Sequence, residues 1–249
     1  MIIECTDSRL LIISDLHIGN PFSHANTQIS AFLKYAKRER FNLCINGDGF
    51  EILQASFANL AGDSIEILNQ IRGLLEDGLS VYYVVGNHDI VLEHFLESWA
   101  AIQICPFLNL TSGDQRVRIE HGHLYDPMFV KNPDLYEFLT KAAGPLLHIY
   151  PDVYYLWSYY QRLKDKYRKT PEGEEESVYH EAAEMLLRRG FDCVVFGHTH
   201  KPERVELSNG LYVNSGNWMR GNSYVEIIDG RIELKTWDPR THEGLSARG

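Results

Sequence analysis

The first half of the chain alternates short apolar runs with amphipathic stretches. Runs at 10–14, 42–46 and 81–85 are short and largely apolar, as is typical of strands buried on both faces. Between them, residues 29–40 and 64–79 place apolar side chains at helical spacing, with polar side chains opposite. This alternation predicts a mixed sheet with helices packed outside it.

The second half begins with a fourth expected strand at 117–120, after which the pattern changes. Residues 126–190 show helical periodicity broken by prolines and glycines, which predicts an insertion of two or three helices. An acidic run at 172–176 is interpreted as a loop tip. Later strands are expected at 192–196, 204–207, 211–214, 224–228 and 231–237. The short turns between these strands predict an antiparallel second half.

The composition is that of a globular protein with a substantial core. Of the 249 residues, 44% are apolar, 12% are aromatic and 23% are charged, which excludes an intrinsically disordered chain. The length suits one large domain, or one domain that carries an insertion. No apolar stretch approaches the roughly 18 residues of a membrane span, and the first residues lack the layout of a signal peptide. We therefore expect a cytoplasmic protein.

The net charge bears on the expected binding partners, and the spacing of the cysteines bears on the expected cellular compartment. With 24 basic and 34 acidic side chains the formal net charge is −10, and we expect no nucleic-acid partner because neutralising phosphates needs an excess of basic residues. The cysteines are widely spaced and form no CxxC pair; they are Cys5, Cys44, Cys105 and Cys193. This spacing favours buried thiols in a reducing compartment over disulfides or a thiolate zinc site.

Side chains that can bind a metal or a phosphate directly follow five of the predicted strands. They are Asp15 and His17, then Asp48, then Asn87, His88 and Asp89, then His121 and His123, and finally His198 and His200. Sites in open α/β sheets are built at the carboxyl ends of the strands. We therefore expect these side chains to meet in one crevice.

The types of these side chains indicate a pair of metal ions. Carboxylate, imidazole and amide groups without sulfur suit Mn²⁺, Fe²⁺, Zn²⁺, Co²⁺ or Ni²⁺ rather than copper or an iron–sulfur cluster. Seven such ligands exceed the needs of one tetrahedral ion but suit two ions that share a bridging ligand. Two ions roughly 3.5–4 Å apart can clamp the attacking and leaving oxygens of a displacement at phosphorus.

The motifs DLH, GD, GNHD, HGH and GHTH, in this order, resemble those of the calcineurin-like metallophosphoesterase family. The resemblance extends over roughly residues 10–125 and 191–237. It implies an α/β fold, a four-layer α/β/β/α metallophosphoesterase sandwich with an inserted helical cap. The expected catalytic domain comprises 1–125 and 191–240, the helical lid comprises 126–190, and 241–249 form a C-terminal tail.

The resemblance also implies a role for each motif residue. The first ion would be held by Asp15, His17, Asp48 and His200, and the second by Asp48, Asn87, His121 and His198. Mn²⁺ is the expected metal, with Fe²⁺, Zn²⁺, Co²⁺, Ni²⁺ or Mg²⁺ as alternatives. A hydroxide that bridges the two ions would attack phosphorus. His88 would stabilise the phosphoryl oxygens or protonate the leaving group, and Asp89 would orient His88 through its other ring nitrogen.

The position of the helical insertion resembles that in the UDP-2,3-diacylglucosamine pyrophosphatases of lipid A synthesis. The block at 47–51 is similar to their GD-x-F-E motif, and Asp126 follows HGH at about the spacing of an acidic residue in that group. His88 stands where many members carry arginine, and His123 stands where HGD is common. His123 is interpreted either as a substrate contact or as a cap on a turn.

The insertion combines an aromatic face with a basic cluster. Its aromatic residues at 150–160 have helical spacing, and five cations follow between Arg162 and Lys169. This segment could accept an acyl chain and an anionic head group, with Arg162 as a substrate contact, or rest on a lipid surface. It could equally be a packed helix face and a solvated charged face paired with the acidic run.

Together these features predict hydrolysis of a phosphoanhydride or phosphodiester in a phosphorylated, acylated small molecule such as a lipid-linked nucleotide sugar. The alternatives are a phosphodiesterase or phosphatase acting on nucleotides or another phospholipid, and a non-catalytic protein-binding scaffold of the same fold. We expect a cytoplasmic location, with contact at the inner face of the membrane left open. The oligomeric state does not follow from the sequence.

Overall fold

The computed structural model describes residues 3–20, 23–52, 57–95, 101–127 and 174–243. Within this part of the chain, two six-stranded sheets contain the strands. The first, sheet A, consists in spatial order of β1 (Ile3–Thr6), β6 (Phe107–Ser112), β7 (Gln115–Glu120), β8 (Cys193–Phe196), β10 (Gly210–Asn214) and β9 (Glu203–Leu207). Sheet B consists of β12 (Arg231–Thr236), β11 (Ser223–Ile228), β2 (Arg9–Ile13), β3 (Asn42–Asn46), β4 (Val81–Val84) and β5 (Gln103–Cys105).

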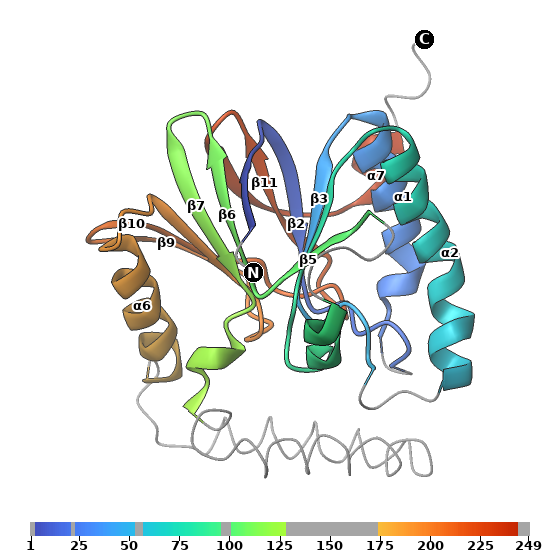
Figure 1. Cartoon of the computed structure of the whole chain (residues 1–249), viewed down its shortest axis with the longest axis horizontal. Helices are drawn as coiled ribbons and strands as arrows, with labels where there is room; N and C mark the ends of the chain where they lie inside the picture. Colours follow the sequence, from blue (N-terminus) through green and yellow to red (C-terminus); the bar gives the residue numbers. More distant parts are fainter. Residues whose placement is uncertain (1–2, 21–22, 53–56, 96–100, 128–173, 244–249) are drawn as a thin grey trace.

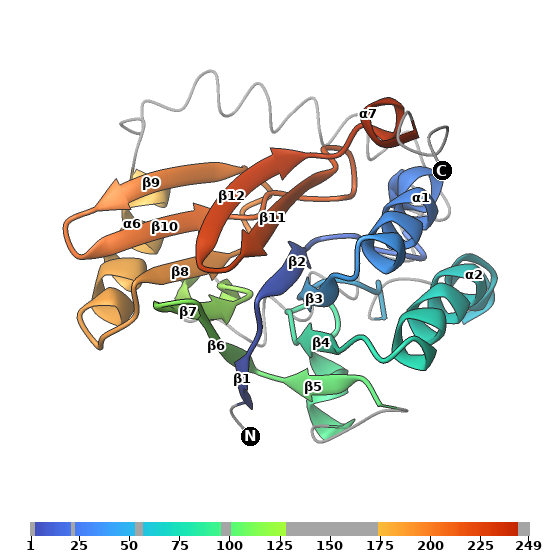
Figure 2. The ribbon, with the colours of Figure 1, turned by 90° about the horizontal axis from the view of Figure 1, so that it is seen from above.

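Helices cover the outer faces of both sheets. α1 (Ala25–Arg38) and α2 (Phe57–Glu76) lie on sheet B, and α6 (Glu174–Leu187) lies on sheet A (Figures 1 and 2). The remaining short helices are η1 (Ile90–Phe95), η2 (His123–Tyr125) and α7 (Pro239–Glu243). The described residues therefore form the four layers α/β/β/α, and the predicted fold class is confirmed.

The apolar run of β2 shows why the central strands lack an alternating pattern. Leu10 and Ile12 are fully buried between the two sheets. Leu11 and Ile13 point the other way and pack with Phe32 under the helices. Because both faces of sheet B are covered, both sets of side chains are apolar.

Strand direction brings several strand ends to one edge of the molecule. β2, β3, β4 and β5 are parallel neighbours, and β7 and β8 are parallel in the other sheet. η1 and η2, which follow β4 and β7, both lie below the sheets in Figure 1. The loops that follow β2, β3, β4, β7 and β8 therefore gather at this edge.

The predicted antiparallel second half is only partly right. The hairpins β9–β10 and β11–β12 are antiparallel, but β10 pairs in parallel with β8. The reason is that β9 occupies the edge of sheet A, so that the chain turns back through β10 and inserts it between β8 and β9.

Three strands were not expected from the sequence. β1 and β6 mix polar with apolar side chains; alternate residues are buried in β6, and none is fully buried in β1. β5 has 3 residues, too few to show a period. Such strands obtain their stability from their neighbours in the sheet rather than from a recognisable pattern of their own.

The acidic run at 172–176 was interpreted as a loop tip, and this interpretation is wrong for its C-terminal part, because α6 begins at Glu174. Acidic residues suit the first turn of a helix, whose N-terminus carries a partial positive charge. α6 packs on sheet A, where Ala183 and Leu186 lie in one apolar cluster with Val194 and Phe196. The aromatic and basic segment of the expected lid, with Arg162, lies outside the described residues.

Candidate metal centre

The structure brings together all seven side chains that the sequence predicts as metal ligands. In the first group, the ligand atoms of Asp15, His17 and His200 lie within 4.8 Å of one another. His200 Nε2 is 3.0 Å from Asp15 Oδ1 and 3.4 Å from His17 Nε2. Two imidazole nitrogens and a carboxylate oxygen thus converge on one point.

A second group lies on the other side of Asp48. The ligand atoms of Asp48, His121 and His198 also lie within 4.8 Å of one another. His121 Nε2 is 3.3 Å from Asp48 Oδ2 and 3.2 Å from Asn87 Oδ1. The same Asp48 oxygen is 3.9 Å from His17 Nε2, so it faces both groups.

Hydrogen bonds turn the imidazoles of both groups toward the centre. His121 Nδ1 donates to the backbone carbonyl of Asn46 at 2.8 Å. Asp126 Oδ2 lies 3.0 Å from His198 Nε2, and Glu51 Oε2 accepts a hydrogen bond from His17 Nδ1 at 2.8 Å. Histidines that bind metals commonly have such a partner on the ring nitrogen that faces away from the ion.

The backbone is left-handed at five of the seven predicted ligands. Nine residues other than glycine have a positive φ in the described part of the chain, and five of them are predicted ligands. These five are Asp15 (54°), His17 (48°), Asp48 (52°), His198 (65°) and His200 (60°). Left-handed backbone is uncommon outside glycine, although Asp and His adopt it more readily than most residues, and it concentrates at functional sites. This distribution therefore supports a functional role for the cluster.

Glycines allow the loops to approach one another. A Cβ atom on Gly47 would lie 2.3 Å from His121 Nδ1, and one on Gly86 would lie 2.2 Å from Asp48 Oδ1. Contacts this short do not occur between real atoms, so a larger residue at either position would force apart the loops that carry Asp48, Asn87 and His121.

The cluster is an array of buried, compensating charges. Burial disfavours the charged form of Asp48, but His121 and His88 outweigh this effect and hold the pKa of its carboxyl well below the ordinary value. Burial likewise opposes the charge on His121, yet Asp48 and Asp15 raise its pKa to about 10. Protons on imidazoles therefore balance the carboxylates, and divalent cations could replace these protons.

His88 lies beside the cluster, and the sequence was wrong about the residue that orients it. Its Nδ1 donates to Glu51 Oε1 at 2.6 Å, and its backbone N–H donates to Asp48 Oδ1 at 2.9 Å. Burial lowers the pKa of His88, but Asp48 and Glu51 raise it to about 9. The imidazole is therefore protonated at neutral pH and can donate from Nε2.

Asp89 does not orient His88, because its carboxylate is engaged elsewhere. It accepts hydrogen bonds from the backbone N–H groups of Gly86 at 2.7 Å and Gly49 at 2.9 Å, and from the Tyr83 hydroxyl. Burial and the nearby Asp48 raise the pKa of Asp89 to about 6. Asp89 thus ties together the loops that carry Asp48 and Asn87.

Glu51 is the residue that the predicted site lacked. Its carboxylate is only 1% exposed and accepts hydrogen bonds from His17, His88 and Asn20. Burial raises its pKa, but the bonds from His17 and His88 lower it to about 2, so Glu51 is ionised. Its position three residues after Asp48, in the GDGFE block, was the signal that could have identified it.

Two of the predicted substrate contacts, His123 and Asp126, lie around the second group, and the third, Arg162, lies outside the described residues. His123 is buried, with its ring 5.5 Å from that of His121, and burial together with His121 lowers its pKa to about 3. His123 is therefore neutral. The bond between Asp126 and His198 gives Asp126 a part in orienting a ligand, and its contact with substrate stays a prediction.

The segment after β10 braces the first group from outside. Asn217 Nδ2 donates to the His200 carbonyl at 2.8 Å, and the Trp218 N–H donates to the Asp15 carbonyl at 3.2 Å. The hydroxyls of Ser14 and Ser215 lie 2.8 Å apart. These bonds hold the strained backbone of Asp15 and His200 in place.

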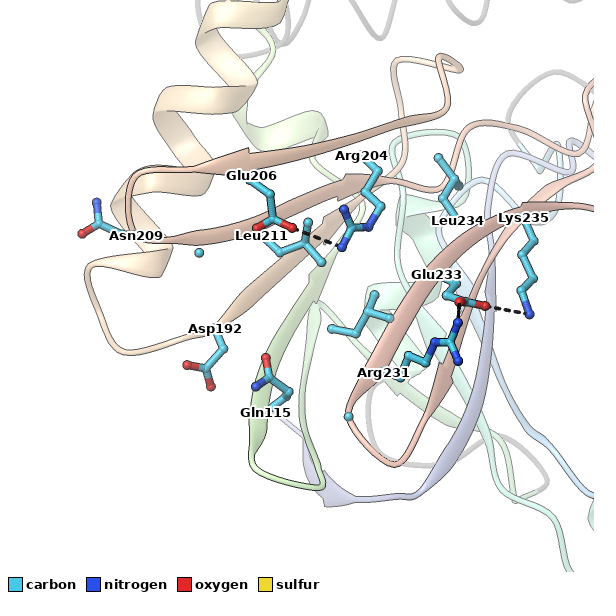
Figure 3. A pocket seen from close by; sticks show the side chains of 13 residues that line it. Gln115, Asp192, Arg204, Glu206, Asn209, Leu211, Arg231, Glu233, Leu234 and Lys235 are labelled. Atoms are coloured by element: carbon cyan, nitrogen blue, oxygen red, sulfur yellow. Dashed lines mark ion pairs between the residues drawn. The ribbon is translucent and has the colours of Figure 1, made fainter.

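A separate hollow of approximately 860 Å³ lies between the edge strands β9 and β12 (Figure 3). Most of its charged side chains pair with one another: Arg204 lies 3.1 Å from Glu206, Lys235 lies 3.0 Å from Glu233, and Glu233 also pairs with Arg231. None of the predicted site residues lines it. The metal centre at the strand ends is therefore the candidate site.

The compensating charges predict how stability depends on pH. In chelator-treated protein, the raised pKa values of His88 and His121, about 9 and about 10, stabilise the fold below the unfolded-state value of about 6.5. This stabilisation is lost as the pH rises toward 10. We expect the melting temperature to fall over this range, and Mn²⁺ to stabilise the protein more as the pH rises because it binds deprotonated imidazoles. Thermal melts at pH 6, 7.5 and 9 test this, and a Mn²⁺ stabilisation that is independent of pH would contradict it.

Comparisons with known proteins agree with the geometry. The model of the calcineurin-like phosphoesterase family matches residues 8–202, which include all seven predicted ligands. A UDP-2,3-diacylglucosamine hydrolase of Psychromonas ingrahamii is 23% identical over 91% of this chain and 96% of that protein. The hydrolase of the same name from Serratia proteamaculans is 25% identical over 90% of this chain and 97% of that protein.

Among solved structures, one described as a novel archaeal phosphodiesterase aligns with a TM-score of 0.49 at 14% identity, over 92% of this chain and 99% of that chain. The family match, in contrast, spans most of the sequence and contains every motif that forms the cluster. The chain therefore belongs to the calcineurin-like phosphoesterase family.

Proposed function

We propose that this protein is a two-metal hydrolase that cleaves the phosphoanhydride of a lipid-linked nucleotide sugar resembling UDP-2,3-diacylglucosamine. The observation that carries the proposal is the pair of ligand groups on either side of the shared Asp48 oxygen. The relatives named UDP-2,3-diacylglucosamine hydrolase support the substrate class, since they align over about nine-tenths of this chain. Water would add to one phosphorus, which would release UMP and the acylated sugar phosphate.

The donor set fits two divalent ions. Asp15, His17 and His200 would hold the first ion, and Asn87, His121 and His198 would hold the second, with Asp48 shared. Nitrogen and oxygen donors without sulfur suit Mn²⁺ and its first-row neighbours. When bound, the ions would supply positive charge for the phosphoryl oxygens and activate the attacking water.

His88 would act on the substrate directly. Because its Nδ1 is committed to Glu51, Nε2 is the atom that can donate to a phosphoryl oxygen or to the leaving-group oxygen. The side chain is 17% exposed, so a substrate could reach it. Its raised pKa keeps the proton available at neutral pH.

The proposed location is the cytoplasm, with the lipid substrate reached at the inner face of the membrane. No helix among the described residues is long and apolar enough to cross a bilayer. Acyl chains would be received by the part of the expected lid that precedes α6, since α6 itself packs on sheet A. For this part the sequence offers an aromatic face and the basic cluster with Arg162.

A substrate panel tests the proposal. Mn²⁺-reconstituted protein is assayed with UDP-2,3-diacylglucosamine, an unacylated UDP-sugar, a CDP-lipid and a cyclic nucleotide, with UMP release measured for the UDP compounds. We expect the acylated UDP-sugar to have the highest kcat/KM. A preference for the CDP-lipid or the cyclic nucleotide would indicate that the substrate is another phosphoester, and no turnover of any substrate would favour a binding scaffold.

The shared position of Asp48 predicts a large loss of activity on substitution. Asp48→Asn should lower kcat/KM by more than about 100-fold, since even groups that only orient metal ligands are worth 10–100-fold.

The role of His88 predicts a dependence on the leaving group. His88→Asn should lower kcat by about 10²–10⁴-fold for a phosphodiester with an alkyl leaving group, which needs a proton. The loss should be much smaller for a nitrophenyl leaving group, which departs as an anion. His180→Asn is the matched control, because His180 pairs with Glu203 at 3.2 Å between α6 and β9, away from the cluster. Equal losses for both leaving groups would contradict proton donation by His88.

The role of Glu51 predicts an effect on metal affinity. Glu51→Gln removes the negative charge that holds His17 and His88, and we expect Mn²⁺ affinity to fall by about 10–100-fold. Calorimetric titration of chelator-treated protein measures this without substrate. Glu203→Gln, which breaks the half-buried pair with His180 outside the cluster, should bind Mn²⁺ like the wild type. Unchanged affinity in the Glu51 variant would show that the carboxylate does not orient a ligand.

A further inference from the structure

Two adjacent tyrosines in β4 face opposite sides of sheet B. Tyr82 points between the two sheets and lies in the same apolar cluster as Cys44. Tyr83 points outward beneath the helices, where its ring stacks on Phe50 at 6.2 Å. Both side chains are almost fully buried, and they differ in what their hydroxyls reach.

The Tyr83 hydroxyl lies under the loops of the metal centre. It donates a hydrogen bond to Asp89 and accepts one from the Gly49 N–H at 3.1 Å. The Gly49 N–H also lies 2.9 Å from Asp89 Oδ2, and the other Asp89 oxygen accepts from the Gly86 N–H at 2.7 Å. Tyr83, Asp89 and two backbone N–H groups therefore form one closed hydrogen-bonded set.

This set connects two ligand-bearing segments that are far apart in the sequence. Gly49 directly follows Asp48, and Gly86 directly precedes Asn87. The Tyr83 hydroxyl packs closely against the backbone of Gly49, because a Cβ atom on Gly49 would lie 2.5 Å from the hydroxyl oxygen. A shift of the hydroxyl would therefore move the backbone beside Asp48.

Packing alone does not require this hydroxyl. The ring of Tyr83 lies among apolar side chains, with Ile45 and Ile104 as its direct neighbours across the strands. A phenylalanine would fill the same space, and a buried tyrosine hydroxyl is costly unless it has a partner. The partners of this hydroxyl all belong to the loops of the metal centre.

We infer that Tyr83 is a positioning residue of the metal centre, whose hydroxyl acts with Asp89 to set the spacing between the loops that carry Asp48 and Asn87. The inference rests on the proposed two-metal function, since Asp48 and Asn87 would hold the second ion together. Tyr83 is not among the residues that would hold the ions, and its hydroxyl acts through Gly49 and Asp89. It fixes the distance across which the second ion must be bound.

The matched pair Tyr83→Phe and Tyr82→Phe tests this inference. Each variant removes one hydroxyl from the same strand, but only the first hydroxyl contacts the loops of the metal centre. Chelator-treated, full-length proteins are titrated with Mn²⁺ in a calorimeter, and the visible spectrum is recorded with Co²⁺. We expect Tyr83→Phe to bind the second ion about 10–100-fold more weakly and to change the Co²⁺ spectrum, while Tyr82→Phe matches the wild type.

The possible outcomes separate the inference from the proposed function. Wild-type protein that binds fewer than two ions would remove the two-metal proposal and the inference with it. Two ions in the wild type, with unchanged affinities and Co²⁺ spectrum in Tyr83→Phe, would overturn the inference alone. Thermal melts report whether the variants fold; if Tyr83→Phe does not, Asp89→Asn replaces it, since an amide cannot accept from both loops and the Tyr83 hydroxyl as the carboxylate does. Retention of the second ion by Asp89→Asn would then be the contrary result.

Discussion

The burial of negative charge at one edge of the two sheets is the constraint on which the rest of the site depends. The carboxylates of Asp15, Asp48, Glu51 and Asp89 are at most 1% exposed. Buried charges are tolerated only where opposite charges or hydrogen-bond donors compensate them. Asp15 and Asp48 face the centre and are compensated by imidazoles that metal ions can deprotonate. Glu51 and Asp89 point away from the metal centre and remain buried. They accept hydrogen bonds from imidazole, hydroxyl and backbone N–H groups, and these bonds hold the loops of the centre in place.

The position of the site could be predicted from the sequence because it depends on strand ends. β2, β3, β4 and β8 are short, buried and largely apolar, whereas β7 mixes polar with apolar residues, and each of the five strands is followed by an acid, an amide or a histidine. Parallel pairing then brings these loops to one edge. The order of the strands within the sheets was harder to predict, since β1 pairs with β6, which is distant from it in the sequence.

Which partner each acidic side chain contacts could not be predicted, because loops lack the regular alternation of side-chain direction that strands have. Adjacent residues in a strand point to opposite faces, but the left-handed backbone at Asp15, His17 and Asp48 redirects each side chain individually. His88 meets Glu51, which is 37 residues away, rather than its neighbour Asp89. The Asp89 carboxylate turns instead toward the backbone of Gly49 and Gly86. Only the spacing of the GDGFE block pointed to Glu51.

The left-handed backbone of five ligands has a consequence for how such a centre can change over time. Each strained residue costs of the order of 1–3 kcal/mol, which a glycine at the same position would not incur. Substitutions that relax these positions would stabilise the fold but remove metal ligands, so selection for activity is what retains the ligands. Replacement of such a ligand by glycine would therefore relax the backbone at that position while removing a donor from the metal centre.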